Sequence, residues 1–296
     1  MRPPSRPRIH VVLAVATFAT LGVAGGMVWE PTEPPIFSLL ELLDPVRLLD
    51  TFLSGVPYAV WVLAILGAHE MGHYVACRLY GIPATLPFFL PGIPPLGSFG
   101  AVIRIRGPIP DRRALFDVAA AGPIAGFAVT LPVLVFGVLQ AQPFVPSPGV
   151  DPGSAVKLGE PVLLSLLQRF MSEPGELAVN AWIGAGWVGL LVTSLNLFPV
   201  GQLDGGHAAY AWSRRMHTVL ARATLVALLG VVVAQIVVFR QFPFYVVWLA
   251  ILLWMRDRHP RLFDEATPLG AGRKVVAVLL AIIFALSFIL VPIYID

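Results

Sequence analysis

Five consecutive residues, His69-Glu70-Met71-Gly72-His73, have the composition and spacing of a zinc-dependent hydrolytic site. On a helix, residues four positions apart lie on one face, so both imidazoles can bind the same ion. Glu70 lies beside them and can serve as a general base toward water. The alternative is a pair of core histidines that hydrogen-bond to the glutamate. The otherwise uncharged run around the pentad favours the metal site, because buried polar groups are costly unless compensated.

A second motif, NLFPVGQLDGG, extends from Asn196 to Gly206. Pro199 and Gly201 are expected to end an apolar helix there. Zinc bound by two histidines still needs a third protein ligand, and Asp204 is the most suitable oxygen donor. The alternative is that Asp204 caps the N-terminus of the next helix.

The composition indicates what kind of protein must position these residues. Of 296 residues, 57% are hydrophobic and 12% are charged, and the mean hydropathy is +0.81. Soluble domains carry about twice this share of charged residues, which excludes a disordered chain, an ordinary cytosolic enzyme and a nucleic-acid partner. A lone cysteine, Cys77, excludes a disulfide framework and any multi-cysteine metal site.

Apolar runs predict an all-α polytopic membrane protein with about seven transmembrane helices, since each crossing needs roughly 20 apolar residues. The predicted spans are 9–29, 57–80, 114–140, 176–200, 217–239, 243–255 and 274–294. The run at 243–255 is short for a full crossing.

The basic residues predict how these spans are oriented. With seven spans and a cytoplasmic N-terminus, 16 of the 20 Lys and Arg residues fall on the cytoplasmic side. The C-terminus is then outside, and anionic lipid headgroups are the expected contacts of the basic residues. We expect the membrane to be the bacterial plasma membrane.

The segment 83–110 is apolar but contains seven prolines, so it cannot be one helix. Its β-prone stretch Ser98–Arg106 predicts a hairpin or re-entrant strand buried in protein. The Pro-, Gly- and Ser-rich loop 141–175 is expected to carry a surface helix near 160–171.

Together, the two motifs resemble the signatures of the site-2 proteases, a family of intramembrane zinc metalloproteases. The resemblance covers about residues 57–215 and includes Leu96–Gly100, which is similar to a glycine-bearing hairpin motif of the family. The stretch PFFLPGIPPLGSFG resembles the chloroplast and cyanobacterial branch most. The loop 141–175 is too short for the PDZ domain of some bacterial members.

The resemblance implies a catalytic core at 57–215, preceded by an anchor helix and outside loop (1–56) and followed by transmembrane helices (216–296). It implies one Zn²⁺ per chain, with His69, His73 and Asp204 as ligands and Glu70 as general base. Asn196 is then expected to bind or stabilise the reacting peptide group. The implied substrate is a membrane protein with a single span, such as an anchored regulator, held by the strand edge at Gly97, Ser98, Phe99 and Gly100.

Alternatives remain open at this point. An ion- or proton-coupled transporter also uses intramembrane acids and broken helices. Other membrane zinc proteases usually take their third ligand from a glutamate motif. Asp117 is expected to be structural or to shape the site, and His207 to lie beside the ligands or at the membrane interface.

Overall fold

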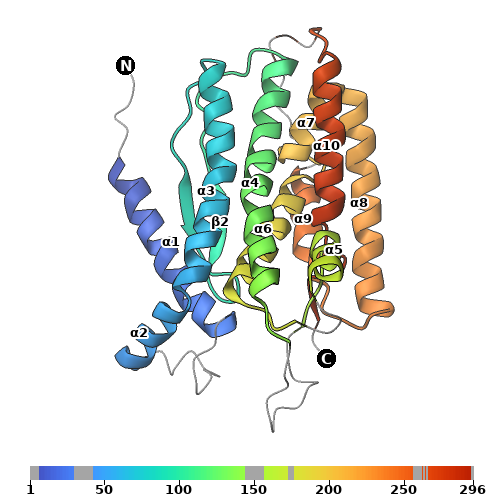
Figure 1. The fold of residues 1–296 in the computed structure, drawn as a ribbon. Coiled ribbons are helices and arrows are strands. Elements are labelled where there is room, and N and C mark those ends of the chain that lie inside the picture. The colour runs from blue at the N-terminus through green and yellow to red at the C-terminus, as the bar shows by residue number, and fades with distance from the viewer. Residues whose placement is uncertain are drawn as a thin grey trace.

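A computed structural model of the protein describes residues 7–29, 43–143, 157–172, 177–255, 262, 264 and 266–294. Arg2, Arg6, Arg256, Arg258, Arg261 and Asp296, which contribute to the predicted orientation, lie outside the described residues. The fold is mostly helical (Figure 1). The helices are α1 (Pro7–Val28), α2 (Pro45–Ser54), α3 (Val56–Leu79), α4 (Arg112–Gln140), α5 (Val162–Met171), α6 (Ala181–Asn196), α7 (Asp204–Trp212), α8 (Arg214–Val237), α9 (Tyr245–Met255) and α10 (Ala271–Ser287).

Each predicted span has a helical counterpart, but the helices differ in length. Among the described residues, four helices are long and apolar enough to cross a membrane, namely α1, α3, α4 and α8. Helices α5, α6 and α9 are apolar but shorter. Large apolar side chains are exposed on the outer helices, for example Val15 on α1 and Val226 on α8. Such surfaces are stable against lipid, and the chain is an integral membrane protein.

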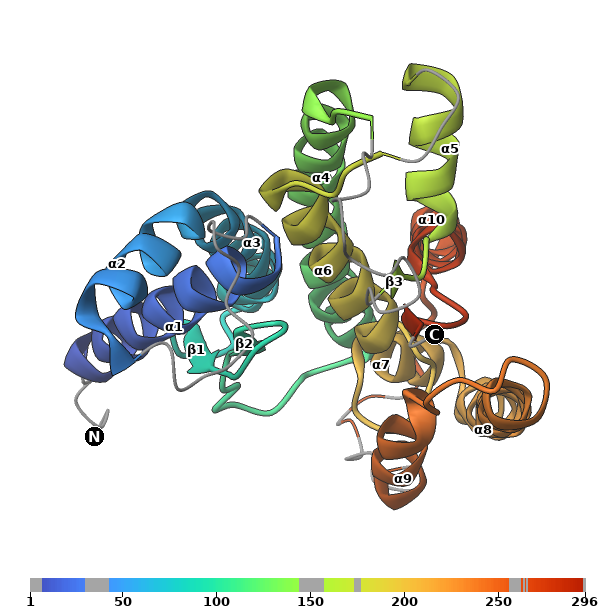
Figure 2. The same cartoon turned by 90° about the horizontal axis from the view of Figure 1, so that it is seen from below.

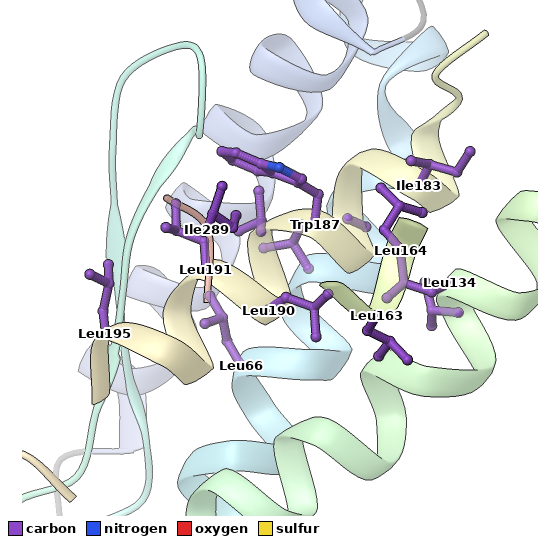
Figure 3. Packing of buried hydrophobic residues seen from close by; sticks show 14 of the residues in the cluster. Leu66, Leu134, Leu163, Leu164, Ile183, Trp187, Leu190, Leu191, Leu195 and Ile289 are labelled. Atoms are coloured by element: carbon purple, nitrogen blue, oxygen red, sulfur yellow. The ribbon is translucent and has the colours of Figure 1, made fainter. Parts of the chain in front are cut away.

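Helix α6 forms the centre of the molecule. Thirteen of its sixteen residues are buried, and it packs against α3, α4 and α10. Figure 3 shows its side chains, including Trp187 and Leu190, interdigitating with Leu66 of α3 and Leu134 of α4. The helix is about 24 Å long at 1.5 Å per residue, shorter than the predicted span 176–200. Asn180 caps its N-terminus, and the chain breaks after Asn196.

The proline-rich segment forms the expected hairpin. Strands β1 (Phe88–Pro91) and β2 (Ser98–Val102) pair in antiparallel register, and a bridge between Ala84 and Ile105 extends the pairing. Figure 2 shows the hairpin on the same side of the molecule as α1, α2 and α3. Contacts with α1 and α3 support it, but none of its strand residues is fully buried and Phe99 and Val102 are exposed, so it is less buried than the sequence predicted.

Two elements were not predicted. Helix α2 begins at an Asp-Pro pair, where the Asp44 carboxylate accepts a hydrogen bond from the Val46 amide (2.9 Å). Strands β3 (Lys157–Leu158) and β4 (Ile293–Tyr294) form a second, very short antiparallel pair. Helix α5 corresponds to the surface helix expected near 160–171, although two of its own residues, Leu163 and Leu164, are buried.

Candidate metal centre

The pentad lies in the second half of α3, with all three of its polar side chains buried. His69, Glu70 and His73 have exposed fractions of 3%, 7% and 8%. The ligand atoms of these three residues lie within 4.8 Å of one another. The helical spacing therefore brings both imidazoles to one face, as the sequence predicted.

Asp204 reaches the same point from the other motif. Its Oδ2 lies 3.3 Å from His69 Nε2 and 3.4 Å from His73 Nε2, and the two Nε2 atoms are 3.2 Å apart. In a tetrahedral zinc site with bonds of about 2.0–2.1 Å, ligand atoms are separated by about 3.3 Å. This donor set fits a zinc ion, and its near-equal spacings favour Asp204 over Glu70 as the third ligand. The two motifs meet because α3 and α7 both pack against α4.

The break between α6 and α7 explains how Asp204 is aimed. Helix α6 ends at Asn196, and Gly201 adopts a positive φ of 58° in the turn that follows. Helix α7 begins at Asp204, with Leu203 in the N-cap position and no side-chain cap. A side chain at Gly205 would place its Cβ 2.0 Å from the Leu197 carbonyl, so this close approach requires glycine. The expected alternative, a capping role for Asp204, therefore differs from the observed geometry.

Helix α4 fixes the orientation of the second histidine. The Val118 carbonyl accepts a hydrogen bond from His73 Nδ1 at 2.7 Å, which leaves Nε2 to face Asp204. Gly122 lies one turn further along α4, where a Cβ would be 2.1 Å from His73 Nε2. The glycine therefore provides the space that the imidazole occupies.

A cavity of about 240 Å³ opens beside the three convergent side chains. Asn196 lines it, with its Nδ2 3.4 Å from His69 Nε2, so this residue also joins the site. His207 and Gln202 line the same cavity. The cavity gives a reacting group access to a site whose metal-binding atoms are otherwise enclosed.

The hairpin contributes the opposite wall, but not through the residues the sequence singled out. Ala101, Val102, Ile103 and Ile105 line the cavity. The backbone of Ile103 also hydrogen-bonds to the Glu70 carboxylate. The backbone groups of Arg104 and Arg106 form hydrogen bonds with Pro83 and Thr85. Backbone groups of successive residues in a strand point in opposite directions, so those of residues 101, 103 and 105 point away from this pairing and toward the cavity.

The predicted substrate-binding residues 97–100 lie farther from the site. Gly97 has a positive φ of 76° and packs on α1, where its carbonyl accepts a hydrogen bond from Thr20 (2.8 Å). Phe99 is 72% exposed, and none of these four residues lines the described cavity. Gly97 thus holds the hairpin against α1, with the later residues of the strand beside Glu70.

Asp117 is structural. Its carboxylate accepts hydrogen bonds from Arg273 (2.6 and 2.8 Å) and from the Tyr80 hydroxyl (2.5 Å). These contacts join the end of α3, the start of α4 and the start of α10. The pair is only partly buried, and Asp117 does not line the cavity at the metal-binding atoms.

Sequence reasoning did not identify Val118, Ala101 or Ile103. The Val118 contribution is a backbone carbonyl, which no side-chain motif reveals. The continuing alternation to Arg106 was the signal for the strand residues.

Comparison with known proteins identifies a family and several relatives that this chain is similar to. The sequence pattern described as "Peptidase family M50" matches residues 57–239. A protein described as "Probable zinc metalloprotease EGY2, chloroplastic" from Arabidopsis thaliana is 33% identical over 225 residues, covering 74% of this chain and 38% of that protein. "Probable zinc metalloprotease EGY1, chloroplastic" from Arabidopsis thaliana is 29% identical over 292 residues, covering 95% of this chain and 52% of that protein. The chain spans about half the length, or less, of these curated relatives.

Proposed function

Because this chain belongs to peptidase family M50, the site-2 proteases, we propose that it is a zinc metalloprotease that cleaves membrane proteins within or near their transmembrane segments. One observation carries the proposal. The two His Nε2 atoms and Asp204 Oδ2 lie 3.2–3.4 Å from one another, beside a cavity that also contains Glu70 and Asn196.

His69, His73 and Asp204 would hold one zinc ion, which when bound lowers the pKa of water and polarises a carbonyl group. Glu70 accepts the water proton on a carboxylate oxygen and delivers it to the amine that leaves. A carboxylate that is not a ligand keeps a free oxygen for this transfer. Val118 holds His73 in the tautomer whose Nε2 is available to the metal.

Asn196 is proposed to bind the reacting peptide group. Its amide lies at the rim of the ligand set, 3.4 Å from His69 Nε2, in the turn that also delivers Asp204. A side-chain amide placed there can donate a hydrogen bond to the oxygen that gains negative charge during peptide hydrolysis.

The substrate is proposed to bind as a strand along residues 101–105 rather than 97–100. A helical substrate hides its carbonyls in hydrogen bonds, so cleavage requires an extended segment. The inward-facing edge of β2 and its continuation offers backbone donors and acceptors beside Glu70. Two proline variants test which stretch binds the substrate. Ala101→Pro removes a backbone amide at the cavity, and Phe99→Pro removes a backbone amide of the same strand outside the cavity. Ala101→Pro should lose substrate cleavage while Phe99→Pro retains most of it, and equal loss would contradict this placement.

We further propose seven membrane crossings with a cytoplasmic N-terminus, an outside C-terminus and a catalytic core at 57–215, in a bacterial plasma membrane. The distribution of basic residues supports this orientation. Reporter fusions in the 201–216 loop and at Asp296 should report opposite sides. The same side at both points would contradict a seven-span arrangement, most simply at 243–255.

The protease proposal is tested by reconstituting the protein in liposomes with a single-span test substrate. Wild-type protein should release fragments that mass spectrometry locates within or next to the span, and a zinc chelator should stop the release. An ion-coupled transporter would instead move ions without stoichiometric zinc and without producing fragments. That outcome would overturn the proposal.

A further inference from the structure

The structure contains a second cavity, of about 300 Å³, between α4, α7, α8 and α10. It shares no lining residue with the cavity at the metal centre among the residues described. We propose that this groove binds one anionic phospholipid, with its phosphate at Lys274 and Arg215 and an acyl chain along α8 and α10. This binding does not depend on the proposed protease activity.

Two helices form the walls of the groove. On α8, Met216, Leu220 and Thr224 follow one another at intervals of four residues and therefore lie in one line. On α10, Ala277 and Phe284 form the facing line. Figure 1 shows that both helices start at the same end of the molecule and run in the same direction. The result is an open apolar channel parallel to the helix axes.

Basic residues gather where both walls begin. Lys274 precedes Ala277 by three residues, one turn closer to the helix start. Its ammonium group lies 6.0 Å from the ring centroid of Trp212, which lines the groove. Arg215 immediately precedes the lining residue Met216, and the side chains of Lys274 and Arg215 are exposed. A ligand that suits this end of the groove is therefore negatively charged.

The length of the groove matches one leaflet. The α8 line from Met216 to Thr224 spans eight residue steps, or about 12 Å at 1.5 Å per residue, and half of a 30 Å hydrocarbon core is about 15 Å. A groove with an apolar body and a cationic end fits one acyl chain of a lipid that has an anionic head. The lining includes small side chains, Ala277 and Ala281, which leave room for a chain instead of filling it. A phospholipid of the leaflet nearest Lys274 has this chemistry.

The experiment measures lipid retention by native mass spectrometry of purified protein mixed with equal amounts of dioleoyl phosphatidylglycerol and dioleoyl phosphatidylcholine. Wild-type protein should retain one phosphatidylglycerol in preference to phosphatidylcholine. The double variant Lys274→Gln/Arg215→Gln should lose about fivefold in this preference for each charge removed, or about 25-fold in total. The control Arg169→Gln/Arg240→Gln removes two charges elsewhere and should match wild type.

A second pair of variants tests the apolar part. Ala281→Phe fills the groove and should lower phosphatidylglycerol retention, whereas Val226→Phe adds the same bulk at an exposed position of α8 outside it. Equal retention of both lipids by wild type, or unchanged preference in Lys274→Gln/Arg215→Gln, would overturn the proposal. If Ala281→Phe blocks cleavage of the test substrate while phosphatidylglycerol is retained, the groove receives a substrate helix and the proposal fails.

Discussion

Gly122 is the residue whose substitution should disturb the metal centre most selectively. It contributes no ligand and no hydrogen-bonding side chain. In Gly122→Ala, the new Cβ would lie 2.1 Å from His73 Nε2 and 2.4 Å from Cε1 of the same ring. An ordinary van der Waals contact begins near 3.4 Å, so the ring has to retreat by about 1.3 Å.

The surrounding helices prevent an easier adjustment. Helices α3 and α4 are already in close contact at Gly72, where a Cβ would be 2.3 Å from the Ala121 carbonyl. A metal site tolerates ligand displacements of only about 0.2 Å. We therefore expect zinc affinity to fall at least 10- to 100-fold, or about 1.4–2.7 kcal/mol, as when a partner that orients a ligand is lost.

Zinc affinity would be measured by competition with a chromophoric chelator, and folding by thermal unfolding of the metal-free protein. Gly230→Ala on α8 is the matched control, because a Cβ there meets nothing within 4 Å. Gly126→Ala is intermediate, since its Cβ would lie 3.1 Å from His69 Cβ. The expected order of zinc affinity is Gly230→Ala, Gly126→Ala, then Gly122→Ala. Affinity of Gly122→Ala within twofold of Gly230→Ala would refute the assignment of His73 as a ligand.

Three other changes have defined outcomes. Asn196→Ala should retain zinc but lower kcat about 10²- to 10³-fold, as expected for loss of a donor to the developing oxyanion; an unchanged kcat would remove Asn196 from the reaction. Arg273→Gln should lower the unfolding free energy by about 1 kcal/mol, because its ion pair with Asp117 is partly exposed, and an equal effect from Arg113→Gln would show that the pair contributes nothing specific. The Asp264 carboxylate accepts hydrogen bonds from the Thr267 side chain and the Ala266 amide, which lowers the pKa of Asp264. Since the folded-state pKa is lowered, this turn should be stable above about pH 4 and weaken as the pH falls further, with faster hydrogen exchange at Ala266; exchange independent of pH after correction for the intrinsic rate would contradict this.

The residues of the proposed metal centre could be predicted from the sequence more completely than the walls around them. His69 and His73 were identifiable because helical periodicity alone determines which side chains share a face. Asp204 was identifiable because a broken apolar helix leaves few oxygen donors. Which residues of the hairpin line the cavity was not determined by local pattern, because it depends on how Gly97 packs on α1 and where the register with β1 begins.

The fold shows a similar division. Hydrophobic runs located the helices, because the side chains of each helix face either lipid or the protein core and are therefore mostly apolar. The boundaries of α6 depended on Asn180 and on the break after Asn196, and burial by its neighbours lets a helix of sixteen residues occupy the centre. The contact between Gly122 and His73 could not be predicted, because it requires the packing of α3 on α4 in three dimensions.

The most direct test of the central claim is zinc content and substrate cleavage measured side by side in Glu70→Gln and Asp204→Asn. Glu70→Gln should keep zinc near the wild-type level but should not cleave, because it loses the base and no ligand. Asp204→Asn should lose both, since a neutral amide is a weaker donor than a carboxylate. Full zinc occupancy with normal cleavage in Asp204→Asn would contradict the account, and so would wild-type cleavage by Glu70→Gln.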